Sequence, residues 1–119
     1  NSIINQARNA KEQTEISEEK EILQRASANA AGKDVYGNIT KTNLDNELDD
    51  IIGKDNYSST ENSKGIYVTY TESQRTYLVE SDGNVKEVII YDRTGISVGD
   101  YIDYSPDETS ETSYFLEKI

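Results

Sequence analysis

The side chains that could do chemistry in this chain of 119 residues are carboxylates, hydroxyls, amines and phenols, because it contains neither histidine nor cysteine. Without cysteine there is no disulfide framework, no thiolate metal site and no cysteine nucleophile. The remaining groups show no spacing typical of a general acid/base pair, a phosphate-binding loop or a nucleophile elbow. We therefore expect no catalytic residues and no cofactor, and we expect that the protein is not an enzyme.

Two groups of acidic residues are candidates for a charged site. The first, within residues 15–21, has the spacing of an exposed helix face. The second, within residues 45–50, lacks the D-x-D-x-D-G spacing of a calcium loop. We interpret both as solvated surfaces and predict no metal site. The members are Glu15, Glu18, Glu19 and Glu21 in the first group, and Asp45, Asp49 and Asp50 in the second.

The charge balance limits the partners. The formal net charge is −11, from 23 acidic and 12 basic residues, so phosphate backbones and anionic membrane surfaces are repelled. We expect no nucleic-acid partner. No apolar run approaches the ~20 residues needed to span a bilayer. Because the chain opens at Asn1 without a methionine, we expect that an upstream segment has been removed, and that any membrane contact is made through it.

Tyrosine is the dominant aromatic residue, with nine tyrosines and one phenylalanine. A tyrosine offers a large contact area with a polar tip, which suits subunit interfaces and sugar stacking. The same residue is also favoured in strands for its β-propensity alone, and we prefer this interpretation for most of them. Three remain as candidate partner contacts: Tyr101, Tyr104 and Tyr114.

The longest element is predicted from Ser2 to Ala31, a stretch without proline or glycine that ends at Gly32. At about 100° per residue its apolar side chains divide between two roughly opposite faces. We expect the C-terminal half to pack on the protein's own core and the N-terminal half to project and pack on something else. One face carries Ile3, Ala7, Ala10 and Thr14, and the other carries Ile16, Leu23, Ala26 and Ala30.

The rest of the chain predicts a short helix and then a sheet. Residues 41–52 have apolar positions at helical spacing after a capping Thr40. From Asn56 the period changes to two and the residues become Tyr, Val, Thr and Ile. We predict an α+β fold, with a long N-terminal α-helix packed on a three- or four-stranded antiparallel β-sheet and a short second helix in the connection. The predicted strands are 56–60, 66–71, 75–80 and 85–91.

The chain divides at residue 91. Residues 1–91 form the predicted domain, and residues 92–119 are a strand-rich extension. The extension is either an appended strand pair or the start of a further domain.

Several stretches resemble type IV pilin-like proteins of Gram-positive anaerobes. Residues 1–20 resemble the segment that follows the membrane-spanning half-helix of these pilins, and Tyr36-Gly37-Asn38-Ile39-Thr40 resembles the connection after the helix. The segment Leu44 to Leu48 and the stretch Tyr77 to Val85, with its Ser-Asp-Gly-Asn turn, also match. The resemblance covers roughly residues 1 to 91.

This resemblance implies a structural subunit of an extracellular, type IV pilus-like filament. Such a subunit acts by self-assembly through its N-terminal helix, with copies of itself and other pilins as partners, and is anchored in the membrane before assembly. The isolated domain would be monomeric. Alternatives are a pseudopilin of a type II-like secretion apparatus and a cell-surface binding module or adhesin. The expected assembly face is Ile3, Ile4, Ala7 and Ala10, and the expected helix–sheet core is Ile16, Leu23, Ala26 and Ala30.

Overall fold

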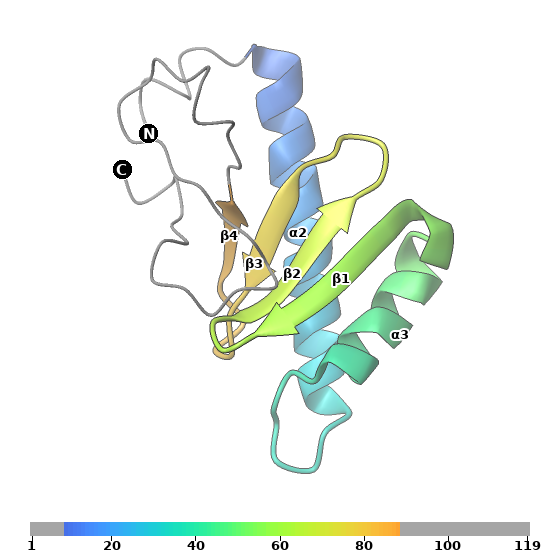
Figure 1. Ribbon diagram of the computed structural model, residues 1–119, viewed down its shortest axis with the longest axis vertical. Coiled ribbons are helices and arrows are strands. Elements are labelled where there is room, and N and C mark those ends of the chain that lie inside the picture. The colour runs from blue at the N-terminus through green and yellow to red at the C-terminus, as the bar shows by residue number, and fades with distance from the viewer. Residues whose placement is uncertain (1–8, 89–119) are drawn as a thin grey trace.

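The long first helix begins at Ala10 in the computed structural model of the protein, which describes residues 9–88. This helix, α2, spans Ala10–Gly32 (Figure 1). Asn9 has an extended backbone, and its side chain accepts a 2.8 Å hydrogen bond from the Glu12 amide. Such a cap satisfies an amide that has no helical carbonyl partner. The helix predicted from Ser2 to Ala31 therefore does not run unbroken through Asn9, and residues 2–8 lie outside the described residues.

Helix α3, Lys41–Ile51, follows a short connection and is capped by Thr40, whose hydroxyl accepts a 3.1 Å hydrogen bond from the Asn43 amide. The ammonium group of Lys33, just after α2, binds the carboxylate of Glu47 on α3. This hydrogen bond raises the pKa of Lys33 and lowers the pKa of Glu47. The pair links the end of α2 to the middle of α3.

Four strands form one antiparallel sheet after the short 3-10 helix η1, Lys54–Asn56. They follow each other in the sheet in the order β1-β2-β3-β4, as expected for short hairpin connections. The register places Tyr57 opposite Tyr70 and Val68 opposite Tyr77. The strands are β1, Tyr57–Asn62; β2, Gly65–Tyr70; β3, Thr76–Val79; and β4, Val85–Val88.

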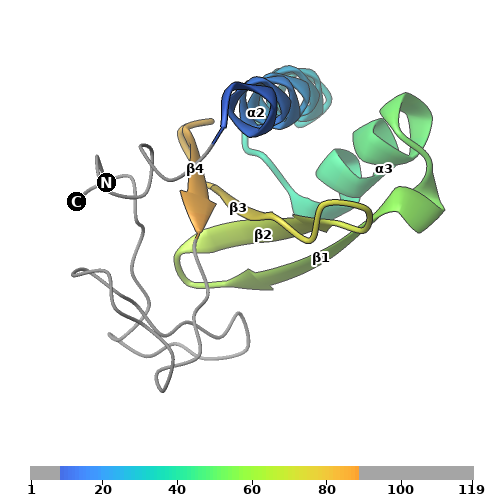
Figure 2. The same ribbon diagram turned by 90° about the horizontal axis from the view of Figure 1, so that it is seen from above.

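Both helices lie on the same face of the sheet, α2 on the side of β3 and β4 and α3 on the side of β1 (Figures 1 and 2). Apolar side chains from the helices and from alternate strand positions fill the space between the layers. The prediction of an α+β fold with a long helix, a second helix and an antiparallel sheet is confirmed. The core consists of Leu23, Ala26, Ala30, Leu44, Leu48, Ile66, Val68, Tyr70, Tyr77, Val79 and Val85.

Hydrogen bonds tie α3 to β1, so the second acidic group is not simply solvated. The Ser59 hydroxyl donates to Asp45 at 2.6 Å, and the Tyr57 hydroxyl donates to Asp49 at 2.7 Å. Burial raises the pKa of the Tyr57 phenol, and the bond to Asp49 raises it further. The interpretation of Asp45 and Asp49 as purely solvent-facing is therefore wrong.

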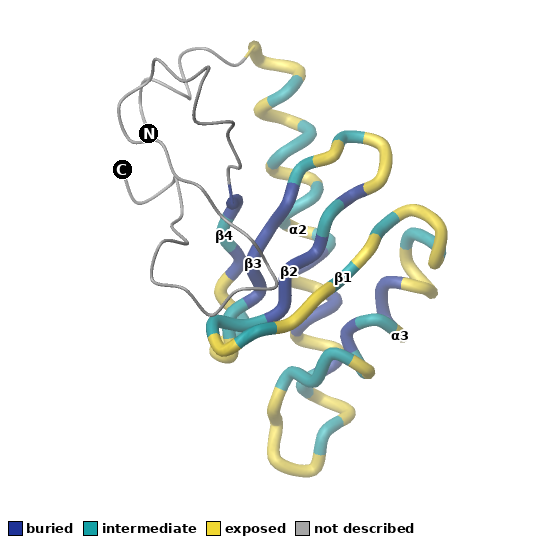
Figure 3. The backbone as a smooth tube through the Cα atoms, viewed as in Figure 1, coloured by how far each residue is buried: buried dark blue, intermediate teal, exposed yellow. Residues whose placement is uncertain are grey.

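The sheet is shielded on both faces in its centre. All four residues of β3 are buried, as Figure 3 shows in dark blue. Because successive strand residues point to opposite faces, the helices account for only half of this burial.

Of the helices in residues 9–88, none combines the length and apolar character required to cross a bilayer.

Candidate functional site

A polar cluster around Glu19 joins α2 to the start of β3. One carboxylate oxygen of Glu19 accepts hydrogen bonds from Arg75 Nε at 2.7 Å and from the Tyr77 hydroxyl at 2.6 Å. The other oxygen accepts from the Ser73 hydroxyl at 2.7 Å, and the Glu19 backbone carbonyl accepts from the Tyr70 hydroxyl at 2.8 Å. The Glu19 side chain is only 14% exposed, so its charge depends on these partners.

Arg75 reaches across to three glutamates on successive turns of α2. Besides Glu19, its guanidinium lies 2.9 Å from Glu15 and 3.6 Å from Glu12. Spacings of three and four residues place these carboxylates on one side of the helix. Burial disfavours the charge of Arg75, but the hydrogen bonds to Glu19 and Glu15 outweigh it and raise the pKa of the guanidinium. One cation thus neutralises part of a strongly acidic helix face.

The turn between β2 and β3 presents Ser73 and Arg75 to the helix. It is closed by backbone hydrogen bonds from the Tyr70 amide to the Arg75 carbonyl at 3.0 Å and from the Gln74 amide to the Tyr70 carbonyl at 2.8 Å. Gln74 adopts a positive φ of 62°, which lets the chain reverse tightly. The Ser73 hydroxyl also accepts a hydrogen bond from the Arg75 amide at 3.2 Å.

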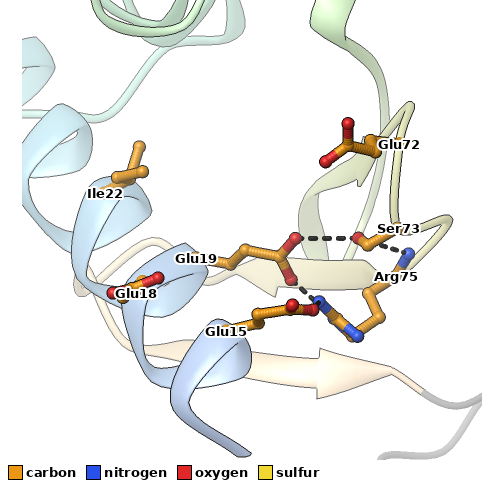
Figure 4. Close-up of a pocket in the computed structure, with 7 residues that line it drawn as sticks. All are labelled: Glu15, Glu18, Glu19, Ile22, Glu72, Ser73 and Arg75. Carbon is orange, nitrogen blue, oxygen red and sulfur yellow. Dashed lines mark hydrogen bonds and ion pairs between the residues drawn. The ribbon is translucent and has the colours of Figure 1, made fainter. Parts of the chain in front are cut away.

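These side chains border an open groove of about 380 Å³ between α2 and the β2–β3 turn (Figure 4). Figure 4 shows Ser73 and Arg75 reaching from the turn toward Glu19 and Glu15 on the helix. The groove is lined by Glu15, Glu18, Glu19, Ile22, Glu72, Ser73 and Arg75.

The polar groups of this groove bind one another and so connect α2 to the β2–β3 turn. The Ser73 hydroxyl donates to Glu19, both of whose oxygens already accept hydrogen bonds, and the chain has no imidazole that could activate a nucleophile. Within residues 9–88, no three acidic side chains are grouped so that they could hold a metal ion. The cluster instead fixes the N-terminal half of α2 to the sheet, and the interpretation of Glu19 as part of a solvated face is wrong.

The residues predicted to join the helix to the sheet lie in the core or at its edge. Leu23, Ala26 and Ala30 are fully buried against the sheet, and Ile16 is half-buried at the edge of the same core. Of the predicted assembly face, Ala10 is exposed at the first helical position. The other predicted contacts lie outside the described residues: Ile3, Ile4 and Ala7 at one end, and Tyr101, Tyr104 and Tyr114 at the other.

Sequence reasoning missed one exposed feature, a turn that carries two large apolar side chains. Val35 and Tyr36, in the connection between α2 and α3, are 92% and 86% exposed. The Asp34 carboxylate accepts hydrogen bonds from the amides of Tyr36 and Asn38 at 3.0 and 2.9 Å. These two hydrogen bonds stabilise the turn. The signal was present in the sequence, as an apolar pair inside a connection of turn-forming residues.

Fold and site together define a two-layer α+β protein in which a long helix is clamped to an antiparallel sheet. Comparison of the chain with protein-family models, with curated proteins and with solved structures finds no match.

Proposed function

We propose that this chain belongs to a structural subunit of an extracellular, type IV pilus-like filament. The observation that carries the proposal is that the two ends of α2 differ in burial. Its C-terminal half is buried against the sheet through Leu23, Ala26 and Ala30, whereas its first turn extends past the β2–β3 turn with Ala10 exposed (Figure 1). The pilin resemblance of residues 1–91 gives this arrangement a function, since the free end of such a helix joins subunits.

The Glu19–Arg75 cluster supports this role because its hydrogen bonds and ion pairs connect α2 to the β2–β3 turn and to β3. A helix that transmits contacts between subunits must not swing on its own domain. Arg75 anchors three carboxylates spread over the turns that precede the buried half of α2. A pair that is this well enclosed and multiply bonded holds geometry more firmly than an exposed ion pair.

The Val35–Tyr36 turn offers a second contact surface. Two large apolar side chains that are almost fully exposed on a hydrogen-bonded turn suit docking into a neighbouring subunit. This turn and the first turn of α2 lie at opposite ends of the helix (Figure 1). A contact between two different surfaces at opposite ends of a subunit is heterologous, and it generates an open helical filament when its rotation does not close into a ring.

Immunogold electron microscopy of cells that express the protein tests the proposal, with antibody raised against residues 9–88. We expect regular label along surface fibres. Label confined to fibre tips would instead indicate a minor subunit or an adhesin. Diffuse label at the envelope without fibres would overturn the proposal and favour a pseudopilin or a surface binding module.

A further inference from the structure

The face of the sheet that points away from the helices carries its own apolar cluster. It consists of Tyr67 on β2, Leu78 on β3 and Val88 on β4, which are adjacent in the register or face the same side. All three are buried, and Leu78 is 0% exposed. Both helices lie on the opposite face (Figure 2), so the helices do not cause this burial.

A sheet with one solvated face alternates between apolar and polar residues, and only a sheet with two covered faces is apolar on both. Here β2 and β3 follow the second pattern: Ile66 and Val68 point to the helices, whereas Tyr67 points away between them. Thr69 and Thr76 continue the outer face, hydroxyl to hydroxyl at 2.8 Å. The outer face of β2, β3 and β4 therefore needs a cover of its own.

We propose that the cover is the C-terminal part of this same chain, residues 89–119, acting chiefly through residues 96–104. The segment continues directly from Val88, a member of the outer cluster. In residues 96–104, the alternate positions are Ile96, Val98, Asp100, Ile102 and Tyr104. An extended segment therefore presents four large apolar or aromatic side chains and one carboxylate on one side. The match between an apolar face and an alternating segment is the basis of the proposal.

Residues 96–104 are long enough to cross the outer face of β2, β3 and β4. Three neighbouring strands at roughly 4.8 Å spacing are about 10 Å across, and residues 96–104 span about 30 Å when extended. Residues 89–95 provide the reach needed to turn from the end of β4 back over the sheet.

A second copy of the chain is the less favoured occupant. A tethered segment, in contrast, meets the face at an effective concentration in the mM range. The inference does not depend on the filament proposal. It removes the outer face from the surfaces that could join subunits and leaves α2 and the Val35–Tyr36 turn.

Paramagnetic relaxation in the full chain tests the proposal, because a chain without cysteine accepts a single nitroxide at any chosen position. Thr60→Cys places the label on an exposed residue of the outer face, opposite Tyr67 in the register. Ser17→Cys places it on the exposed side of α2, and serves as the matched control. Unchanged amide chemical shifts for residues 9–88 would show that both labelled proteins keep the fold.

We expect the amides of residues 96–104 to broaden strongly with the label at position 60 and much less with the label at position 17. Equal broadening, or none, would overturn the proposal. A mixture of spin-labelled protein and unlabelled, isotopically enriched protein gives the remaining outcome. Broadening that persists fully in this mixture would show that a second copy covers the face, and would also overturn the proposal.

Discussion

At the scale of single residues, Glu19 contributes to stability because three side chains donate hydrogen bonds to its carboxylate. Glu19→Gln keeps the shape but removes the charge that offsets Arg75. We expect a loss of about 2 kcal/mol in the free energy of unfolding, measured by urea denaturation, since Arg75 retains Glu15 and Glu12. Glu18→Gln, at an exposed residue of the same groove, should change it by less than ~0.5 kcal/mol. Equal effects would contradict a clamp centred on Glu19.

Tyr77 makes the free energy of unfolding depend on pH in the alkaline range. Burial raises the pKa of the Tyr77 phenol, and its hydrogen bond to Glu19 raises it further; burial also raises the pKa of Tyr70. An unfolded tyrosine loses its proton near pH ~10. Above that pH the unfolded chain binds fewer protons than the native one, so stability is complete below pH ~10 and falls as the pH rises.

We therefore expect Tyr77→Phe to reduce the slope of unfolding free energy against pH between about pH 10 and 12. It should also cost about 1 kcal/mol at neutral pH through the lost hydrogen bond. Tyr36→Phe, at an exposed tyrosine, is the control and should leave the slope unchanged. An identical slope in all three proteins would show that Tyr77 does not contribute to alkaline unfolding.

Among the elements, the start of β2 depends on Gly65. Its φ is +143°, a conformation that side chains rarely adopt, and an added Cβ would collide with the Val79 carbonyl. We expect Gly65→Ala to cost about 2 kcal/mol or more in chemical denaturation. Gly32→Ala is the control, because a Cβ there meets nothing within 4 Å, and it should be neutral or slightly stabilising. A small effect at Gly65 would contradict this close approach of β2 to β3.

The two halves of the first helical segment should respond differently to the same substitution. Leu23→Asp places an unpaired charge in the core between α2 and the sheet, and we expect a loss above about 4 kcal/mol and unfolding of the domain. Ala7→Asp, outside the described residues, should leave the thermal melting of the isolated domain unchanged and impair filament assembly. If both substitutions lower the melting temperature equally, the division of the helix into a docking half and an assembly half is wrong.

For the whole molecule, the Val35–Tyr36 turn distinguishes assembly from folding. Replacing both residues with serine removes two side chains that touch solvent, so the free energy of unfolding should stay within ~0.5 kcal/mol. Fibres on cells that express this variant should become rarer or disappear in negative-stain electron microscopy. Normal fibres would remove this turn from the proposed contact surfaces while leaving the proposed function open to the immunogold result.

The sequence by itself determined the fold class because periodicity is local information. The change from a 3.6-residue to a 2-residue period near Asn56 separates helices from strands. The two-residue period of a strand places Ile66, Val68 and Tyr70 on one face of β2. Turn residues such as Gly83, with φ of 90° between β3 and β4, make the hairpin order readable.

Only the tertiary structure decided which charges meet. Glu19 and Arg75 are separated by 56 positions, and no local pattern identifies the single arginine that an acidic helix will contact. The start of α2 shows a similar limit: Asn9 is compatible with a helix interior or a cap, and the cap bond to Glu12 decides between them. Burial of the outer face of β3 also required the structure, since four residues cannot reveal that both faces of their strand are covered.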